Sequence, residues 1–185
     1  MSSLNIKKGS SKHSAYDLRD PNSDVIEKHT LAIIVANESG VLARVIGLFS
    51  GRGYNIESLT VAEIDHDGHK SRITIVTTGT PAVITQMKAQ LSRMVPVFDV
   101  QDLTEEGMSV ERELALFYIV SKGKKKVEAF RLAEIFKANV VDSTLSSFMF
   151  ELTGTSEKID EFLELMRPLG LTDTARSGVA ALGRG

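Results

Sequence analysis

The order of apolar and polar residues predicts short strands that alternate with helices. Residues 30–36 are apolar on both alternating faces, which indicates a buried strand, and the next apolar residues recur at helical spacing. That helical stripe consists of Val41, Leu42, Val45, Ile46 and Phe49. Continued to residue 103, the pattern predicts strand, helix, strand, strand, helix and strand. The predicted ranges are 30–36, 40–51, 56–64, 71–77, 81–95 and 97–103.

The same order returns after a polar link at residues 104–107. The second set of predicted ranges is 110–120, 125–137, 140–145, 147–152, 156–166 and 172–179. Each βαββαβ set makes a four-stranded antiparallel sheet with both helices on one face, the ferredoxin-like arrangement. We therefore predict an α+β protein of two tandem ferredoxin-like domains, at residues 29–104 and 108–185, preceded by a disordered extension at residues 1–28.

One face of the first sheet needs a cover that its own helices do not provide. Both helices of a ferredoxin-like unit pack on the same face, yet residues 30–36 are apolar on both faces. A dimer or a second sheet is therefore expected against the other face.

Composition narrows the class of function. The chain has Lys+Arg 22 against Asp+Glu 24 and a formal charge of -2, without a strongly basic half, so we expect no nucleic-acid binding. Strands 30–36 and 71–77 contain no aromatic residue, which argues against an RNA-binding sheet of the RRM type. No apolar run approaches the roughly 20 residues that span a bilayer, so we expect no membrane segment.

The compartment is indicated by cysteine usage and by the N-terminus. The absence of cysteine excludes disulfides and thiolate metal sites and fits a reducing compartment. Residues 1–28 are rich in Ser, Lys, Asn and Asp and contain no apolar signal-peptide core, so a cytoplasmic protein is expected. An organelle transit peptide is the weaker alternative, because this segment carries acidic residues.

The turn at residues 37–42, between the first strand and the first helix, has the chemistry of an anion site. The first amides of a helix have no internal partner, and the helix dipole adds partial positive charge, which suits a carboxylate. Gly40 lets a ligand approach the main chain closely. Glu38 and Ser39 suit the helix start itself, with Ser39 as a helix N-cap. Together with Asn55, one helix later, the turn indicates a receptor for a small amino acid.

Longer sequence blocks around this turn resemble one family. The block Asn-Glu-Ser-Gly-Val-Leu at residues 37–42 and the block Arg-Gly-Tyr-Asn-Ile-Glu-Ser-Leu at residues 52–59 resemble the ACT domain of the acetohydroxyacid (acetolactate) synthase small subunit. The resemblance continues to Ala-Arg-Ser-Gly-Val at residues 175–179 and covers about residues 29–185. Further matching segments are residues 47–50, 71–74, 110–114, 133–136 and 140–142.

This resemblance implies a non-catalytic regulatory subunit in branched-chain amino-acid biosynthesis. Members of the family stimulate a thiamine-diphosphate-dependent catalytic (large) subunit and confer feedback inhibition by valine. The resemblance further implies a homodimer through the ACT domains, no cofactor in this chain, and thiamine diphosphate, magnesium and FAD on the catalytic partner. An ACT-type amino-acid sensor that regulates another enzyme is the alternative, since the same fold would serve it equally.

The resemblance also implies where valine binds, at Asn37, Gly40 and Asn55, with the turn and the second-strand residues meeting across the dimer interface. Free amides at the helix start suit the valine carboxylate, and an Asn carbonyl suits its ammonium. Apolar neighbours would line the branched side chain. The predicted effector site consists of Asn37, Gly40, Val41, Leu42, Asn55 and Ile56.

Other candidate chemistry is sparse. The pair His66 and His69 lies in a polar hairpin, where a solvated turn is favoured over a metal site. The Lys-rich segment 122–126 lacks the P-loop pattern and indicates an exposed loop before a helix, with contact to an acidic partner surface or to a phosphate-bearing effector as the alternative. Glu105 is expected to be a solvated linker residue. No catalytic site is predicted.

Overall fold

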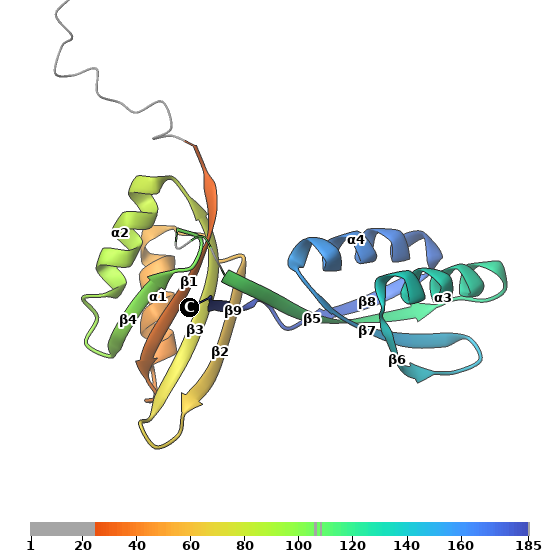
Figure 1. Ribbon diagram of the computed structural model, residues 1–185, viewed down its shortest axis with the longest axis horizontal. Helices are drawn as coiled ribbons and strands as arrows, with labels where there is room; N and C mark the ends of the chain where they lie inside the picture. The colour runs from red at the N-terminus through yellow and green to blue at the C-terminus, as the bar shows by residue number, and fades with distance from the viewer. Residues whose placement is uncertain (1–24, 106, 108, 185) are drawn as a thin grey trace, which may run out of the picture.

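The computed structural model describes residues 25–105, 107 and 109–184, and these form two sheets, each with helices on one face (Figure 1). The first sheet has the strand order β2-β3-β1-β4 and is antiparallel. Its elements are β1 (Glu27–Ala36), α1 (Val41–Arg52), β2 (Ser58–Asp65), β3 (Lys70–Gly79), α2 (Pro81–Leu91) and β4 (Val97–Asp102).

The second sheet repeats this plan with the order β6-β7-β5-β8. Its elements are β5 (Ser109–Val120), α3 (Lys124–Phe136), β6 (Asn139–Ser143), β7 (Ser147–Gly154), α4 (Ser156–Met166), the 3-10 helix η1 (Arg167–Leu169) and β8 (Leu171–Arg176). The prediction of an α+β fold with two tandem βαββαβ units is therefore confirmed.

Each unit has its own core between its sheet and its helices. In the first unit, one face of β1 packs against α1 and α2, and Leu31 and Ile33 have no exposed surface. The second core is rich in phenylalanine, and the rings of Phe117 and Phe162 meet edge to face with centroids 4.9 Å apart. Each sheet is therefore packed against the helices of its own unit.

The end of the chain differs from the prediction. The predicted last strand, residues 172–179, breaks after Arg176, where Gly178 turns the chain with a φ of 79°. A further strand, β9 (Ala180–Gly183), then pairs with the first residues of β5. Residues 172–179 contain only two apolar residues, Ala175 and Val179, so periodicity did not define where the strand ends.

We call residues 177–183 the C-terminal strap, because this segment ties the two units together. On one side the Ser177 amide donates to the Leu114 carbonyl at 2.9 Å. On the other, the Val179 amide donates to Ser58 Oγ at 2.9 Å and Thr60 Oγ1 donates to the Val179 carbonyl at 2.7 Å. Figure 1 shows β9 lying beside the first sheet while β5 continues into the second.

The strap supplies the expected cover on the first sheet. Val179 and Ala181 pack against Ala32 and Val76 on the face away from the helices, and Ala32 is left only 1% exposed. A second sheet within the same chain therefore buries part of this apolar face. The doubly apolar first strand does not by itself require a second copy of the chain.

Several predicted boundaries shift. The predicted extension 1–28 lies mostly outside the described residues, but its end is structured, because β1 begins at Glu27. The helix predicted to reach residue 95 ends at Leu91, where Ser92 Oγ donates to the Lys88 carbonyl at 2.8 Å and competes with helical bonding. In the described part of the chain, no helix is long and apolar enough to cross a membrane.

Candidate functional site

The turn between β1 and α1 presents an open helix start. Gly40 is the N-cap residue, with a φ of 84°, and no side chain of the described residues caps this helix. The prediction of Ser39 as N-cap is therefore wrong. The Arg44 amide donates to the Gly40 carbonyl at 3.1 Å, so the amides before Arg44 precede the regular helical bonding. A backbone at positive φ explains why glycine suits this position.

Val41 behaves differently from the prediction. Its side chain is 2% exposed and belongs to the first core, so the expectation that it lines an effector side chain is wrong. Its amide is not free either, because it donates to the Glu38 carbonyl at 3.3 Å. Leu42, at 36% exposure, is the apolar side chain that the turn presents to solvent. The Leu42 amide lies in the first helical turn, where α-helical geometry offers it no acceptor.

Asn37 has a charged neighbour that the sequence analysis missed. Its Nδ2 donates to Glu63 Oε1 at 3.1 Å, and His66 Nδ1 lies 3.2 Å from the same oxygen. Because the amide nitrogen faces Glu63, the Asn37 carbonyl oxygen remains the natural acceptor for an ammonium. Only the pairing of β3 with both β1 and β2 reveals this contact, since the two residues are far apart in sequence.

Asn55 and Ile56 lie at the other end of the first sheet. Thr77 Oγ1 donates to the main-chain carbonyl of Asn55 at 2.6 Å, and Thr77 pairs with His29 at the beginning of β1. Asn37, in contrast, follows the end of β1, and its amide donates to the His69 carbonyl at 2.7 Å. At about 3.3 Å per residue, the run of β3 between His69 and Thr77 is roughly 25 Å long. The two asparagines of one chain therefore do not share a site.

The hairpin histidines are part of a polar turn. The Gly68 amide donates to Asp65 Oδ1 at 2.8 Å, and the rings of His66 and His69 are 6.4 Å apart. Across residues 25–105, 107 and 109–184, no group of three or more His, Cys, Asp and Glu side chains is arranged to hold a metal ion.

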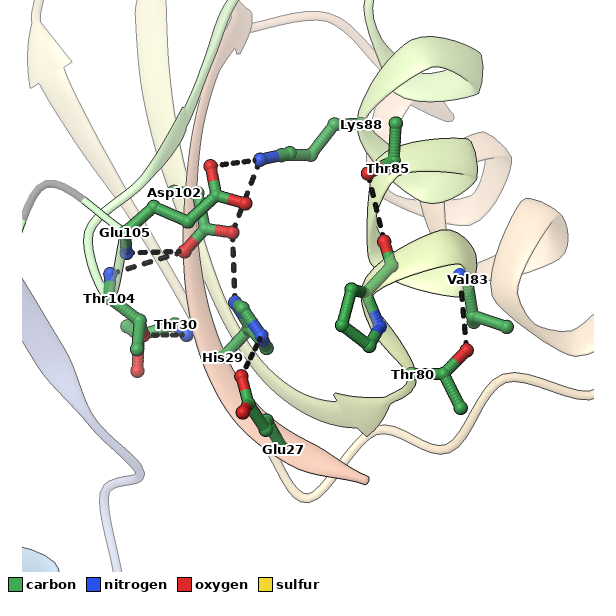
Figure 2. Close-up of polar contacts among 11 residues, drawn as sticks. Glu27, His29, Thr30, Thr80, Val83, Thr85, Lys88, Asp102, Thr104 and Glu105 are labelled. Atoms are coloured by element: carbon green, nitrogen blue, oxygen red, sulfur yellow. Dashed lines mark hydrogen bonds and ion pairs between the residues drawn. The ribbon is translucent and has the colours of Figure 1, made fainter. Parts of the chain in front are cut away.

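A buried cluster at the start of the linker was also missed (Figure 2). His29 Nδ1 lies 2.9 Å from Asp102 Oδ2, and both residues are 5% exposed. Lys88 forms ion pairs with Asp102 and with Glu105. The Glu105 side chain is exposed, as predicted for a solvated linker residue, but the sequence analysis missed its ion pair. Burial would lower the pKa of Lys88, but the hydrogen bond to Glu105 and the charges of both carboxylates raise it above its ordinary value.

The other oxygen of Asp102 organises the turn into the linker. Asp102 Oδ1 accepts from the amides of Thr104 and Glu105 at 3.1 and 3.3 Å, and Thr104 Oγ1 accepts from the Thr30 amide at 3.0 Å. These contacts, visible in Figure 2, fix the end of β4 where the chain leaves the first unit. The cluster therefore has a structural explanation in holding the linker.

A second ion-pair cluster lies at the junction of the two units, beside a cavity of about 430 Å³ lined by residues of both. Arg176 donates through Nε and Nη2 to the two oxygens of Glu113, at 2.7 and 2.6 Å, and Glu113 is 4% exposed. Burial would raise the pKa of Glu113, but the hydrogen bonds and charge of Arg176 hold it below its ordinary value. The sequence block at residues 175–179 is thus a junction between the units.

Comparison with known proteins covers both units. The model of the AHAS small subunit-like ACT domain matches residues 31–99, and the model of the small subunit of acetolactate synthase matches residues 112–185. A probable acetolactate synthase small subunit of Archaeoglobus fulgidus is 44% identical over 85% of this chain and 98% of that protein. The acetolactate synthase isozyme 3 small subunit of Escherichia coli is 46% identical over 85% and 96%.

A solved structure agrees with these sequence matches. The crystal structure of the acetolactate synthase small subunit from Thermotoga maritima superposes with a TM-score of 0.77 at 33% sequence identity. The match covers 86% of this chain and 98% of that one. The similarity therefore extends over both ferredoxin-like units and their junction.

Proposed function

Because the chain belongs to the acetolactate synthase small-subunit family, we propose that it is the non-catalytic regulatory subunit of that enzyme. It stimulates the thiamine-diphosphate-dependent catalytic subunit and makes it sensitive to valine, an end product of branched-chain amino-acid biosynthesis. The observation that carries this proposal is the match of relatives over both units. The match at residues 112–185 favours it over a stand-alone ACT sensor of another enzyme.

The proposal divides the chemistry between the two subunits. Thiamine diphosphate, magnesium and FAD belong to the catalytic partner, and this chain contributes the site for valine. In that site the amides of Gly40 and Leu42 bind the valine carboxylate. The Asn37 carbonyl accepts from the ammonium, and the Glu63 carboxylate, 3.1 Å from Asn37 Nδ2, adds a nearby negative charge.

The remaining half of the site must come from a second copy of the chain. Asn55 and Ile56 lie roughly 25 Å along the sheet from the Asn37 turn of the same chain. We therefore propose a homodimer through the first units, in which Asn55 of each chain faces the turn of the other. Such an exchange is characteristic of a two-fold symmetric interface, where both copies complete each other's site.

Reconstitution tests the proposed function directly. The purified chain should show no pyruvate condensation when thiamine diphosphate and magnesium are supplied, and it should raise the activity of its cognate catalytic subunit. The measurement is acetolactate formation by each subunit alone and by the mixture, with and without valine. Acetolactate formed by this chain alone would refute the proposal, as would a mixture no more active than the catalytic subunit.

Mixed dimers test the shared site. Neither Asn37→Ala nor Asn55→Ala homodimers should bind valine tightly. A mixed dimer keeps one site with both native asparagines, because the intact turn of one chain meets the intact Asn55 of the other. Calorimetric titration of the refolded mixture should therefore recover tight sites, about one for every four chains from random pairing of the two variants. No recovery, or a monomer in sedimentation at micromolar concentration, would contradict the shared site.

A further inference from the structure

An open groove lies on the first sheet, on the face away from its helices. It has a volume of about 560 Å³, and its walls are β2 and β3 on one side and the start of β5 with β9 on the other. The C-terminal strap therefore creates this groove by packing across the sheet. The groove is distinct from the turn at residues 37–42, which we call the effector turn and which lies beyond the end of β1.

The groove is apolar and exposed. Ala62, Ile64, Val110 and Leu182 contribute to its lining, and the side chains of Ile64 and Leu182 are 51% and 61% exposed. Large apolar side chains gathered around a concave surface with a polar rim are typical of a protein-binding site. Burial of the exposed parts of these two side chains against a partner would stabilise the complex through the hydrophobic effect.

The charge of the groove indicates the chemistry of its occupant. Arg72 and Arg112 line it, and none of the described residues that line it is acidic. Arg72 Nη1 donates to the Ala181 carbonyl at 3.1 Å and Arg112 Nη1 to the Glu111 carbonyl at 2.7 Å. A guanidinium has five N–H donors, so each arginine keeps others for a carboxylate.

This charge also argues against a second copy in the groove. If two identical grooves faced each other about a two-fold axis, each would bring its arginines toward those of its partner without an intervening carboxylate. An apolar segment that carries Asp or Glu next to its large side chains is complementary instead.

We propose that this groove is the docking site for an apolar, acidic segment of the catalytic subunit. The identity of the partner as the catalytic subunit rests on the proposed function. The apolar and acidic character of the segment is inferred from the residues that line the groove. The apolar side chains of the segment cover Ile64 and Leu182, and its carboxylates pair with Arg72 and Arg112.

The test compares groove variants with matched variants elsewhere, all in the full-length chain. Leu182→Asp and Arg112→Glu alter the groove, while Leu145→Asp and Arg131→Glu make the same changes at exposed positions of the second unit. Binding to the immobilised catalytic subunit is measured by surface plasmon resonance. We expect the groove variants to bind at least tenfold more weakly and the control variants to stay within about twofold of wild type.

Three further readouts separate the possible results. Thermal unfolding, sedimentation and valine titration of the groove variants should match wild type. Unchanged binding of Leu182→Asp and Arg112→Glu to the catalytic subunit would overturn the groove proposal, and so would their conversion to monomers, which would assign the groove to contact between copies. Failure of the wild-type chain to bind the catalytic subunit would refute the proposed function instead.

Discussion

Replacing Asn55 with alanine should make the reconstituted enzyme insensitive to valine while its stimulated activity persists. We assign to the Asn55 side-chain carbonyl a second hydrogen bond from the valine ammonium. Its loss costs about 1.5–3 kcal/mol and weakens binding by roughly ten- to more than a hundredfold. The Asn55 side chain is exposed, so its loss should leave the fold intact. Calorimetric titration of valine and inhibition curves of the holoenzyme measure the two effects separately.

Gly40→Val should act more strongly than either asparagine variant. Gly40 has a φ of 84°, a conformation that costs a non-glycine residue about 1–2 kcal/mol and a β-branched residue more. No atom lies within 4 Å of a Cβ added there, so the new side chain would occupy the space through which valine reaches the amides. Gly47→Val, at an equally open position on the same helix, is the control and should keep inhibition.

Unchanged valine affinity in Asn37→Ala, Asn55→Ala and Gly40→Val would place the effector elsewhere. In that case the family assignment would stand, because it rests on both units, and the residue assignments would be withdrawn.

Gly178→Ala should loosen the C-terminal strap and lower the free energy of unfolding by about 2–4 kcal/mol. Part of this cost is the backbone, since Gly178 has a φ of 79°. The rest is steric, because an added Cβ would lie 2.8 Å from Ser58 Oγ and 3.0 Å from Thr60 Cγ2. Chemical denaturation measures the loss, and faster hydrogen exchange of the Val179 amide would report detachment of the strap.

Gly53→Ala separates the two contributions. Gly53 has a φ of 70°, but no atom lies within 4 Å of an added Cβ, so this variant should show the backbone cost alone, about 1–2 kcal/mol. Adding Ser58→Ala to Gly178→Ala removes one clashing atom. The double variant should therefore lose less free energy of unfolding than the two single variants lose in sum. Equal losses in Gly178→Ala and Gly53→Ala would show that the strap does not pack closely on β2.

The sequence pattern predicted the bounds of an element where residues within or next to that element determine them. The helix predicted at residues 156–166 has those bounds in the structure, because Thr155 Oγ1 accepts from the Lys158 amide at 3.4 Å and buried residues recur along one face. The break at Gly178 was not predictable from periodicity, because the predicted strand 172–179 has too few apolar residues to mark its end. The positive φ of Gly178 and the close approach of β2 to the strap both favour glycine there.

Contacts between distant residues were beyond the reach of the sequence pattern. His29 and Asp102 are 73 residues apart and meet only because β4 pairs with β1. Glu63 lies next to Asn37 for the same kind of reason, through the pairing of β2, β3 and β1. In contrast, the open helix start at Gly40 was predicted correctly as a feature of the turn, although Val41 proved to be a core residue.

The hydrogen bond from Asn37 to Glu63 links the effector turn to the strand β2 that lines the proposed docking groove. Glu63 lies between Ala62 and Ile64, which line the groove, and the register of β2 against β3 shifts at this point. On our proposals, the Asn37 side chain contacts valine through its carbonyl oxygen and Glu63 through its amide nitrogen, so valine binding and partner docking act on one short piece of strand. Thermodynamic reciprocity then requires the catalytic subunit to change valine affinity by the same factor that valine changes subunit affinity. Free and assembled small subunits would respond to different valine concentrations, so the cell's ratio of the two subunits would itself set the sensitivity of the pathway.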